Sequence, residues 1–314
     1  MDSLAVVFER PQVLSVSRLM LTAPTDADVV VETDFTGIST GTERLLWTGT
    51  MPDFPGMGYP LVPGYETVGH VVDAGKSSGR TVGDSVFVGG ARCYQDARAL
   101  FGGAAKHLVV PGERAIPVDS ALHERATLLA LAATAYHAIS SGANGVPELI
   151  IGHGVLGRLL ARLAVLLGDG RDVTVWETNP LRVHGATTYR VCTPDDDPRR
   201  DYRSIYDVSG DSRILDSLIA RLAPAGEIVL AGFYSDALSF HFPAAFQREA
   251  RVRVAAQWLP ADLTAVAQLM NSGTLALDDL ITHRSPATSA ASAYDTAFHD
   301  AACVKMVLDW RQCS

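Results

Sequence analysis

The first third of the chain alternates short apolar runs with turn residues. The runs are rich in valine and other β-branched or aromatic residues, and Pro, Gly, Asp and Thr separate them. They cover residues 4–10, 13–21, 27–35, 66–75, 83–90 and 105–118. Short runs of this composition, bounded by turn residues, are typical of β-strands. The pattern predicts a small, irregular β-barrel.

The periodicity changes near residue 121. Residues 121–142 are rich in Ala and Leu, which predicts a helix that ends at Gly142. Apolar runs and helical segments then alternate, as strands at 148–154, 172–177, 205–210 and 226–233 and helices at 155–168 and 214–224. Nearly continuous apolar strands interleaved with helices indicate a parallel sheet that is covered on both faces.

The last part of the chain predicts a return to the first domain. Helices are expected near 260–272 and 289–298, with a terminal strand at 303–310, and the charged segment 193–203 is expected to be a solvated surface loop. The predicted domains are a catalytic and substrate domain at 1–122, a dinucleotide-binding domain at 123–257 and a return segment at 258–314.

Composition narrows the functional classes. The chain has 314 residues, of which 47% are apolar and 19% charged, a balance that suits a globular protein with a sizeable core. Its net charge of −9 argues against general binding of nucleic acid, because neutralising phosphates requires clustered Lys and Arg.

No segment reads as a signal peptide or a membrane span. Residues 1–14 lack a basic start, and the longest apolar stretch, 149–168, is interrupted by His153, Arg158 and Arg162. The four cysteines have no metal-type spacing and are Cys93, Cys192, Cys303 and Cys313. We therefore expect reduced thiols and a cytoplasmic protein.

A glycine-rich loop predicts dinucleotide binding. Gly152, Gly154 and Gly157 form G-x-G-x-x-G directly after an apolar strand and at the start of a helix. In this pattern the glycines allow a tight turn, a close approach of the pyrophosphate and close packing of the helix on the strand. The predicted cofactor loop consists of Gly152, His153, Gly154, Val155, Leu156 and Gly157.

Glu177 ends the next predicted strand, at the position where a carboxylate accepts hydrogen bonds from the adenosine ribose. A carboxylate there repels a 2′-phosphate, so NAD is favoured over NADP. Arg182 is close enough in the sequence to keep NADP open.

Several segments together resemble the medium-chain dehydrogenase/reductase superfamily. They are "VPGYETVGHVVDAG", "VGDSVFV", "GGAAKHLVVP", "LAATAYHAI", "GHGVLG", "DVSG", "GEIVLAGF" and "LDDLITHRSP". The resemblance covers nearly the whole chain. It implies an α/β fold in which a Rossmann doubly wound parallel sheet is joined to a GroES-like β-barrel catalytic domain. It also implies a homo-oligomer, and a place for Thr134 near the nicotinamide.

In zinc-dependent members of the superfamily, three side chains hold a catalytic metal, and the resemblance lets each position be compared. Ser39 or Thr40 falls at the first position, depending on where an inserted residue is placed. Tyr65, in "GYE", replaces the metal-binding histidine, and Ala130 falls at the third position. A hydroxyl, a phenol and a methyl do not form the site that zinc catalysis requires, so we expect no metal.

Residues 37–66 resemble in particular the branch of the superfamily that oxidises the 3-(1-hydroxyethyl) side chain of a bacteriochlorophyllide to 3-acetyl in bacteriochlorophyll a biosynthesis. The expected activity is therefore an NAD-dependent oxidation of a secondary alcohol on a tetrapyrrole substrate. A zinc-free quinone or enoyl reductase of the same superfamily is one alternative. A non-catalytic nucleotide-binding partner is another.

Without zinc, a side chain has to accept the hydroxyl proton. The predicted catalytic residues are Tyr65, Glu66, Ser39 and Thr40. Tyr65 lies where the metal-binding histidine would project, and Glu66 would polarise the network or accept the proton through Ser39 or Thr40. A packed aromatic at Tyr65, and a Glu66 that anchors the turn, remain the alternatives.

The same segment offers apolar side chains for the face of a tetrapyrrole. The predicted substrate residues are Trp47, Met51, Phe54, Met57 and Tyr59, with Arg44 (or Arg92) for a propionate carboxylate. A small core beneath the loop is the alternative for each apolar residue.

Overall fold

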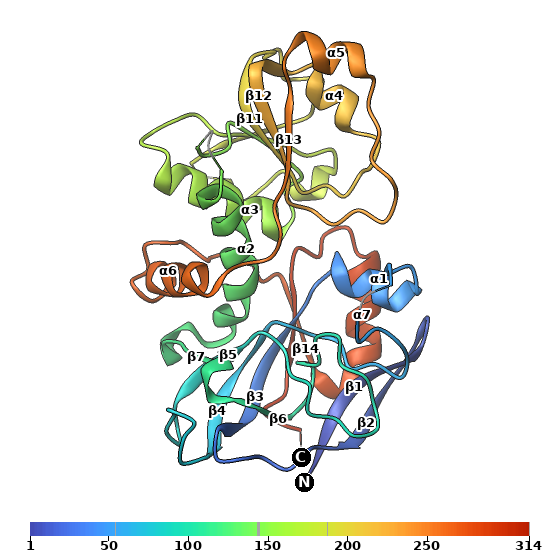
Figure 1. Ribbon diagram of the computed structural model, residues 1–314, viewed down its shortest axis with the longest axis vertical. Helices are drawn as coiled ribbons and strands as arrows, with labels where there is room; N and C mark the ends of the chain where they lie inside the picture. The colour runs from blue at the N-terminus through green and yellow to red at the C-terminus, as the bar shows by residue number, and fades with distance from the viewer. Residues whose placement is uncertain (54, 143–144, 187, 314) are drawn as a thin grey trace. The chain divides into compact units, whose positions relative to one another are not determined.

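The computed structural model describes residues 1–53, 55–142, 145–186 and 188–313 (Figure 1). The chain forms two compact units. The first contains Met1–Ala130 and Ile281–Ser314, and the second contains Leu131–Leu280. The chain therefore returns to its first unit, as the hydrophobic pattern suggests.

The limits of the units differ from the predicted domain boundaries. Residues 123–130 belong to the first unit, and residues 258–280, expected in the return segment, belong to the second. The difference arises because α6 (Pro260–Asn271) comes soon after the last strand of the second unit, and the hydrogen bond between Asp262 and His137 fixes it there.

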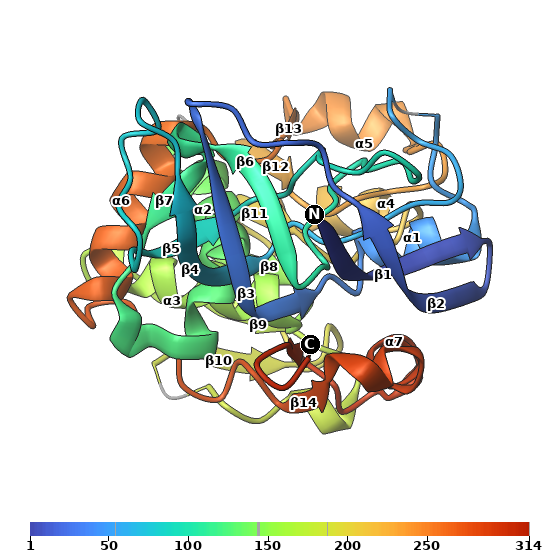
Figure 2. The ribbon, with the colours of Figure 1, turned by 90° about the horizontal axis from the view of Figure 1, so that it is seen from below.

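A seven-stranded mixed sheet organises the first unit, in the order β14-β15-β3-β4-β5-β7. In addition, β6 lies beside β3 (Figure 2). Its strands are β3 (Asp28–Ile38), β4 (Thr67–Ala74), β5 (Ser85–Val88), β6 (His107–Pro111), β7 (Ala115–Pro117), β14 (His283–Pro286) and β15 (Met306–Asp309). A separate hairpin is formed by β1 (Asp2–Arg10) and β2 (Val13–Met20). Because β15 pairs antiparallel with β3, the end of the chain is built into the first unit.

Short helices connect these strands. They are α1 (Thr42–Thr48), η1 (Gly112–Arg114), η2 (Ser120–Leu128), η4 (Ala287–Ser289) and α7 (Ala290–His299). The sequence pattern did not predict α1, which ends at Gly49 in the left-handed region. The predicted strand 105–118 is divided by η1, and His123, at φ 47°, interrupts the predicted helix 121–142.

A six-stranded sheet forms the centre of the second unit, and all its pairings are parallel. In spatial order its strands are β10 (Arg190–Cys192), β9 (Thr174–Trp176), β8 (Leu149–Ile151), β11 (Tyr202–Asp207), β12 (Leu222–Leu230) and β13 (Arg251–Val254). The remaining helices are α2 (Leu129–Ser140), α3 (Val155–Leu167), η3 (Pro180–Arg182), α4 (Leu215–Ile219) and α5 (Phe242–Gln247). This order, with strands on both sides of β8, is that of a doubly wound α/β sheet.

Two local predictions for the second unit are wrong. The helix expected at 214–224 ends at Ile219, because Leu222 already pairs with Tyr202 in the parallel sheet. The segment 193–203 is not simply a solvated loop: Asp197 is 1% exposed and accepts hydrogen bonds from the Trp176 ring and the Tyr202 hydroxyl. A buried carboxylate is stable there because several donors satisfy it.

None of the described helices is both long and apolar enough to cross a membrane.

Candidate functional site

The glycine-rich loop has the geometry that its sequence predicts. Gly152 has a φ of 100°, which favours glycine, and it leads from β8 into the turn before α3. A side chain at Gly157 would collide with the carbonyl oxygen of Gly152. Glycine at both positions therefore allows α3 to begin close to the end of β8.

Gly154 lies in a different environment from Gly157. A Cβ atom built at Gly154 would have no described atom within 4 Å, so the space beside this residue is open. Gly154 is also the residue before the first turn of α3, whose early backbone N–H groups lack partners within the helix. An open space beside these donors fits the pyrophosphate of a dinucleotide.

Glu177 lies just beyond β9, and its carboxylate is held by main-chain donors. The amide of His153 donates to Oε2 at 3.0 Å, and the amide of Asn179 donates to Oε1 at 2.7 Å. The carboxylate is thus fixed next to the glycine-rich loop, and each oxygen retains a lone pair for a further donor. The role of Glu177 in binding a ribose stays a prediction.

His153 supports the loop from inside. Its ring is completely buried and bonds the carbonyl oxygen of Arg182 at 2.5 Å and the hydroxyl of Tyr189 at 2.8 Å. Burial lowers the pKa of His153 to about 4, so the imidazole is neutral near pH 7. The buried Arg158 donates to the same Arg182 carbonyl, so the backbone of Arg182 closes the loop. A role for the Arg182 side chain in cofactor binding stays a prediction.

In the first unit, the structure brings Tyr65 to Ser39 rather than to Thr40. The Tyr65 hydroxyl and the Ser39 hydroxyl are 2.7 Å apart, and both residues are buried. Burial, together with the charge of Glu66, raises the pKa of Tyr65 well above its usual value. The phenol is therefore neutral and can pass a proton on, but it is not itself the base.

Glu66 forms a buried ion pair with Lys305. Both side chains are at most 1% exposed, and the Lys305 ammonium also donates to the carbonyl oxygen of Ile38 at 3.0 Å. A side chain at Gly37 would collide with the Glu66 carboxylate, so glycine is required beside the pair. Oε1 of Glu66 has no hydrogen-bond partner among the described residues. A buried acceptor without a donor suits an incoming hydroxyl group.

A second buried carboxyl, Glu43, lies on α1. Its Oε1 accepts from the Ser39 amide at 3.0 Å, and its Oε2 accepts from the Tyr294 hydroxyl at 2.6 Å. Burial raises the pKa of Glu43 to about 7, and the neighbouring Glu66 adds to the rise. This group therefore changes its protonation state near neutral pH.

The donor set at the former metal positions does not fit zinc. Ser39 and Tyr65 bond each other, and Ala130, completely buried, offers only a methyl group. Zinc sites of this kind require thiolate, imidazole or carboxylate ligands. No three His, Cys, Asp or Glu side chains gather as a metal site anywhere in the described part of the chain.

The predicted substrate residues pack mostly into the first unit. Trp47, Met57 and Tyr59 lie against a core cluster that includes Met51, which is 8% exposed. The Tyr59 hydroxyl donates to the carbonyl oxygen of Leu46. This packing favours the alternative of a small core beneath the loop.

The remaining predicted residues have simpler outcomes. Phe54 lies outside the described residues, and Arg44 and Arg92 are exposed. Thr134 is half-buried on α2, and its place near the nicotinamide stays a prediction. On the same helix, His137 bonds Asp262 at 2.8 Å, which fits a structural role.

Three residues of this site were missed by the sequence interpretation: Glu43, Tyr294 and Lys305. Each of them is at most 1% exposed. Their apolar neighbours in the sequence are the available signal, because a charged residue inside an apolar run such as 303–310 has to be buried with a partner. The sequence alone does not show which partner that is.

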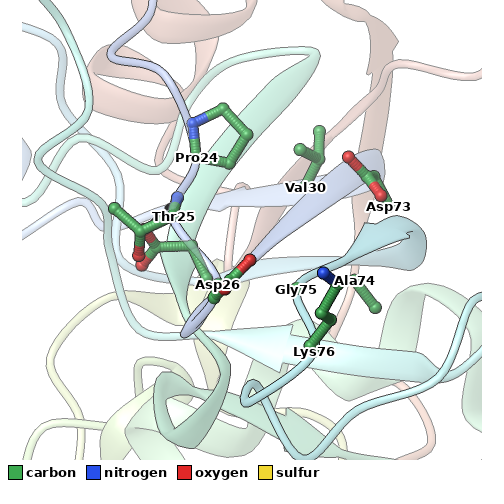
Figure 3. Close-up of a pocket in the computed structure, with 9 residues that line it drawn as sticks. Pro24, Thr25, Asp26, Val30, Asp73, Ala74, Gly75 and Lys76 are labelled. Atoms are coloured by element: carbon green, nitrogen blue, oxygen red, sulfur yellow. Dashed lines mark hydrogen bonds between the residues drawn. The ribbon is translucent and has the colours of Figure 1, made fainter.

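A cavity elsewhere in the first unit is unrelated to this site. It has a volume of about 240 Å³ and lies between the segments around Asp26 and Asp73 (Figure 3). None of the predicted site residues lines it.

Among known proteins, one family model matches part of the first unit, and two relatives match nearly the whole chain. Residues 25–120 match the family model of the alcohol dehydrogenase GroES-like domain. The chain is 53% identical to 2-desacetyl-2-hydroxyethyl bacteriochlorophyllide A dehydrogenase of Rhodobacter capsulatus over 312 residues, which cover 99% of both chains. The protein of the same name from Cereibacter sphaeroides is also 53% identical, again over 99% of both chains.

Solved structures support the fold. A short chain alcohol dehydrogenase from Escherichia coli CFT073, complexed with NADH, superposes with a TM-score of 0.83 at 20% identity, covering 98% of this chain and 99% of that one. The 2R,3R-butanediol dehydrogenase from Bacillus subtilis gives a TM-score of 0.84 at 18% identity, with the same coverage. The predicted fold class is therefore confirmed.

Proposed function

The chain belongs to the medium-chain alcohol dehydrogenase family that includes the 2-desacetyl-2-hydroxyethyl bacteriochlorophyllide A dehydrogenases, and from this premise we propose that it oxidises the 3-(1-hydroxyethyl) group of a bacteriochlorophyllide to 3-acetyl in bacteriochlorophyll a biosynthesis. It is an alcohol oxidoreductase. The observation that carries the proposal is the 53% identity over 99% of the chain.

NAD is the proposed cofactor. Gly152, Gly154 and Gly157 would receive its pyrophosphate, and Glu177 would bind its ribose, because the carboxylate is fixed beside the loop. When bound, the nicotinamide accepts a hydride from the substrate carbon. The carboxylate disfavours a 2′-phosphate, which is the basis for choosing NAD over NADP.

The proposed reaction proceeds without zinc. The donor set of Ser39, Tyr65 and Ala130 does not fit the metal, so the chemistry has to be supported in another way. A carbinol attached to a conjugated macrocycle is easier to oxidise, since the ring stabilises positive character at the carbon that loses hydride. What the protein has to supply is an acceptor for the hydroxyl proton.

We propose that this proton first enters the hydroxyl pair of Ser39 and Tyr65, whose oxygens are 2.7 Å apart and which is neutral. Glu66 polarises the pair, because its charge acts on Tyr65. In addition, Oε1 of Glu66 has no hydrogen-bond donor among the described residues.

A direct assay tests the function. Purified protein is mixed with NAD and 3-(1-hydroxyethyl) bacteriochlorophyllide, and the red absorption band of the pigment is followed while zinc is measured in the same sample. We expect the band to shift without stoichiometric zinc. An unchanged band combined with NADH-dependent reduction of quinones would favour a zinc-free quinone reductase. Bound zinc would contradict the metal-free mechanism.

Tyr65→Phe tests the role of the hydroxyl pair. The variant keeps the ring against Phe101, whose centroid is 5.0 Å away, but removes the hydroxyl that bonds Ser39. We expect kcat to fall about 100-fold, the lower range for general acid–base groups, with an unchanged Kd for NAD. Unchanged kcat would assign Tyr65 to packing alone.

A homo-oligomer is the proposed assembly. β13 ends the six-stranded sheet, and its Val252 and Val254 are 44% and 73% exposed. Among the described residues, no strand pairs with the outer edge of β13, and an exposed strand edge with apolar side chains favours pairing with a second copy. We expect light scattering to give at least the mass of a dimer.

We also infer a reducing, cytoplasmic environment, because the four cysteines carry thiols.

A further inference from the structure

Two carboxyl groups share a single ammonium group inside the first unit. Glu43 and Glu66 are both completely buried, and Lys305 is 1% exposed. Coulombic interaction with each other raises the proton affinity of such neighbours, and one ammonium compensates only one carboxylate. At neutral pH the cluster therefore has room for one exchangeable proton.

The contacts distinguish the two carboxyls. Burial raises the pKa of Glu66, but the direct contact with Lys305 acts in the opposite direction and favours the ionised form of that group. Glu43 instead receives two neutral donors, the Ser39 amide and the Tyr294 hydroxyl. Neutral donors stabilise a carboxylate less than a contacting ammonium does, so Glu43 is the group that takes a proton first.

The groups that face Glu43 come from every neighbouring element. The charged ones are Glu66, next to the start of β4, and Lys305, next to the start of β15. The titratable hydroxyls are Tyr294 on α7 and Tyr65, whose pKa the Glu43 charge raises in turn. With these neighbours, burial raises the pKa of Glu43 to about 7.

Ser39 connects this carboxyl with the hydroxyl pair. Its amide donates to Glu43, and its hydroxyl bonds Tyr65. We propose that Glu43 is a positioning residue: when ionised, it holds Ser39 by its amide and so keeps the Ser39–Tyr65 pair in place to receive the hydroxyl proton when the alcohol is oxidised. This inference rests on the proposed function, and it assigns the pH dependence of the hydroxyl pair to Glu43.

In the oxidation step, the C–H bond of the carbinol breaks, and its hydrogen leaves with both electrons as hydride to the nicotinamide. The O–H bond breaks, its electron pair forms the second bond of the carbonyl, and its proton enters the hydroxyl pair. The hydroxyl pair then releases a proton to solvent, while Glu43 stays ionised and holds the Ser39 amide.

Infrared titration of the protein without cofactor tests the protonation of Glu43. The carbonyl band of a protonated, buried carboxyl group should disappear as the pH rises through about 7, and it should be absent from Glu43→Gln. Tyr294→Phe keeps the ring in the core but removes the hydroxyl that donates to Oε2. The midpoint should then rise by roughly one pH unit, because a hydrogen bond to the ionised form has been lost.

The pH profile of alcohol oxidation tests the functional part. In the wild type, kcat/KM should rise through the same midpoint, in Tyr294→Phe the rise should move to higher pH, and in Glu43→Gln it should vanish with a loss of about 100-fold. Circular dichroism confirms that each variant is folded, and Tyr294→Phe carries the test if Glu43→Gln does not fold.

The outcomes separate this inference from the proposed function. A profile that is unchanged in Glu43→Gln and Tyr294→Phe but altered in Glu66→Gln would overturn the role of Glu43 and assign the pH dependence to Glu66. An infrared band that does not titrate near pH 7 would overturn it as well. A wild type that titrates as expected but leaves the pigment unoxidised would reject only the proposed function.

Discussion

Two buried carboxylates, Glu177 in the second unit and Glu66 in the first, are held in different ways. The backbone amides of Asn179, close to Glu177 in the sequence, and of His153, in the glycine-rich loop, donate hydrogen bonds to its two oxygens. Glu66 instead depends on the side chain of Lys305, which lies next to the start of β15. The charge of Glu177 is compensated by the fixed dipoles of backbone amides. The charge of Glu66 is compensated by the ammonium group of Lys305, which a single substitution removes.

The comparison shows where each region is vulnerable. The nucleotide loop depends on the absence of side chains at its glycines, so added atoms should damage it. The Tyr65 region depends on side chains that compensate one another, so removed atoms should damage it. Three substitution experiments examine this difference, beginning with the largest expected effect.

Lys305→Met should cause the largest loss of stability. The substitution leaves Glu66 buried without its counter-charge, and breaking a buried pair in this way costs about 3–5 kcal/mol. Denaturant unfolding measures the free energy of unfolding. The double variant Lys305→Met/Glu66→Gln is the control and should recover much of the loss, because the uncompensated charge is gone. No recovery would show that Lys305 matters through packing rather than charge.

Glu43→Gln should change how stability depends on pH. The folded protein raises the pKa of Glu43 from 4.5 to about 7, so the folded state binds this proton more tightly than the unfolded state. The contribution is therefore complete below about pH 4.5 and is lost as the pH rises to about 7. The loss corresponds to on the order of 3 kcal/mol.

The measurement compares the free energies of unfolding of the wild type and Glu43→Gln at pH 5 and pH 8. The advantage of the variant should be greater at pH 8, where the wild type has to bury an ionised carboxylate. Asp211→Asn changes a half-buried acid whose pKa is lowered by Arg213, and it is a control expected to lack this trend. Parallel pH curves for the wild type and Glu43→Gln would contradict the raised pKa.

The glycines of the nucleotide loop should separate stability from cofactor binding. In Gly157→Ala the methyl group meets the Gly152 carbonyl, so the free energy of unfolding should fall by about 1–3 kcal/mol without any cofactor. In Gly154→Ala the methyl group enters open space, so stability should be nearly unchanged while the Kd for NAD rises. Thermal unfolding and calorimetric titration measure the two effects. Equal losses of stability would reject the distinction.

Much of the nucleotide loop could be predicted because its determinants are local. Gly152, Gly154, Gly157 and Glu177 follow one another within a single strand–helix–strand unit, and each role depends on backbone geometry. The fold class follows from the same regularity, since the strand and helix periods are properties of short segments.

The proton-accepting region could be predicted only in part. Tyr65 and Ser39 were expected near each other through the family resemblance, whereas Tyr294 and Lys305, which contact Glu43 and Glu66, lie far from them in the sequence. Similarly, Asp197 is charged in a polar segment and yet buried, because Trp176 and Tyr202 supply donors that no local pattern reveals. Tertiary partners decided these positions.

The origin of Lys305 also bears on how the molecule is made. The second unit is one continuous segment, Leu131–Leu280, whereas the first needs Ile281–Ser314 as well. During synthesis from the N-terminus, Glu43 and Glu66 emerge long before Tyr294 and Lys305. The nascent first unit cannot bury these carboxylates with their final partners until residue 305 has left the ribosome. The second unit, although it is synthesised later, can therefore complete its fold first.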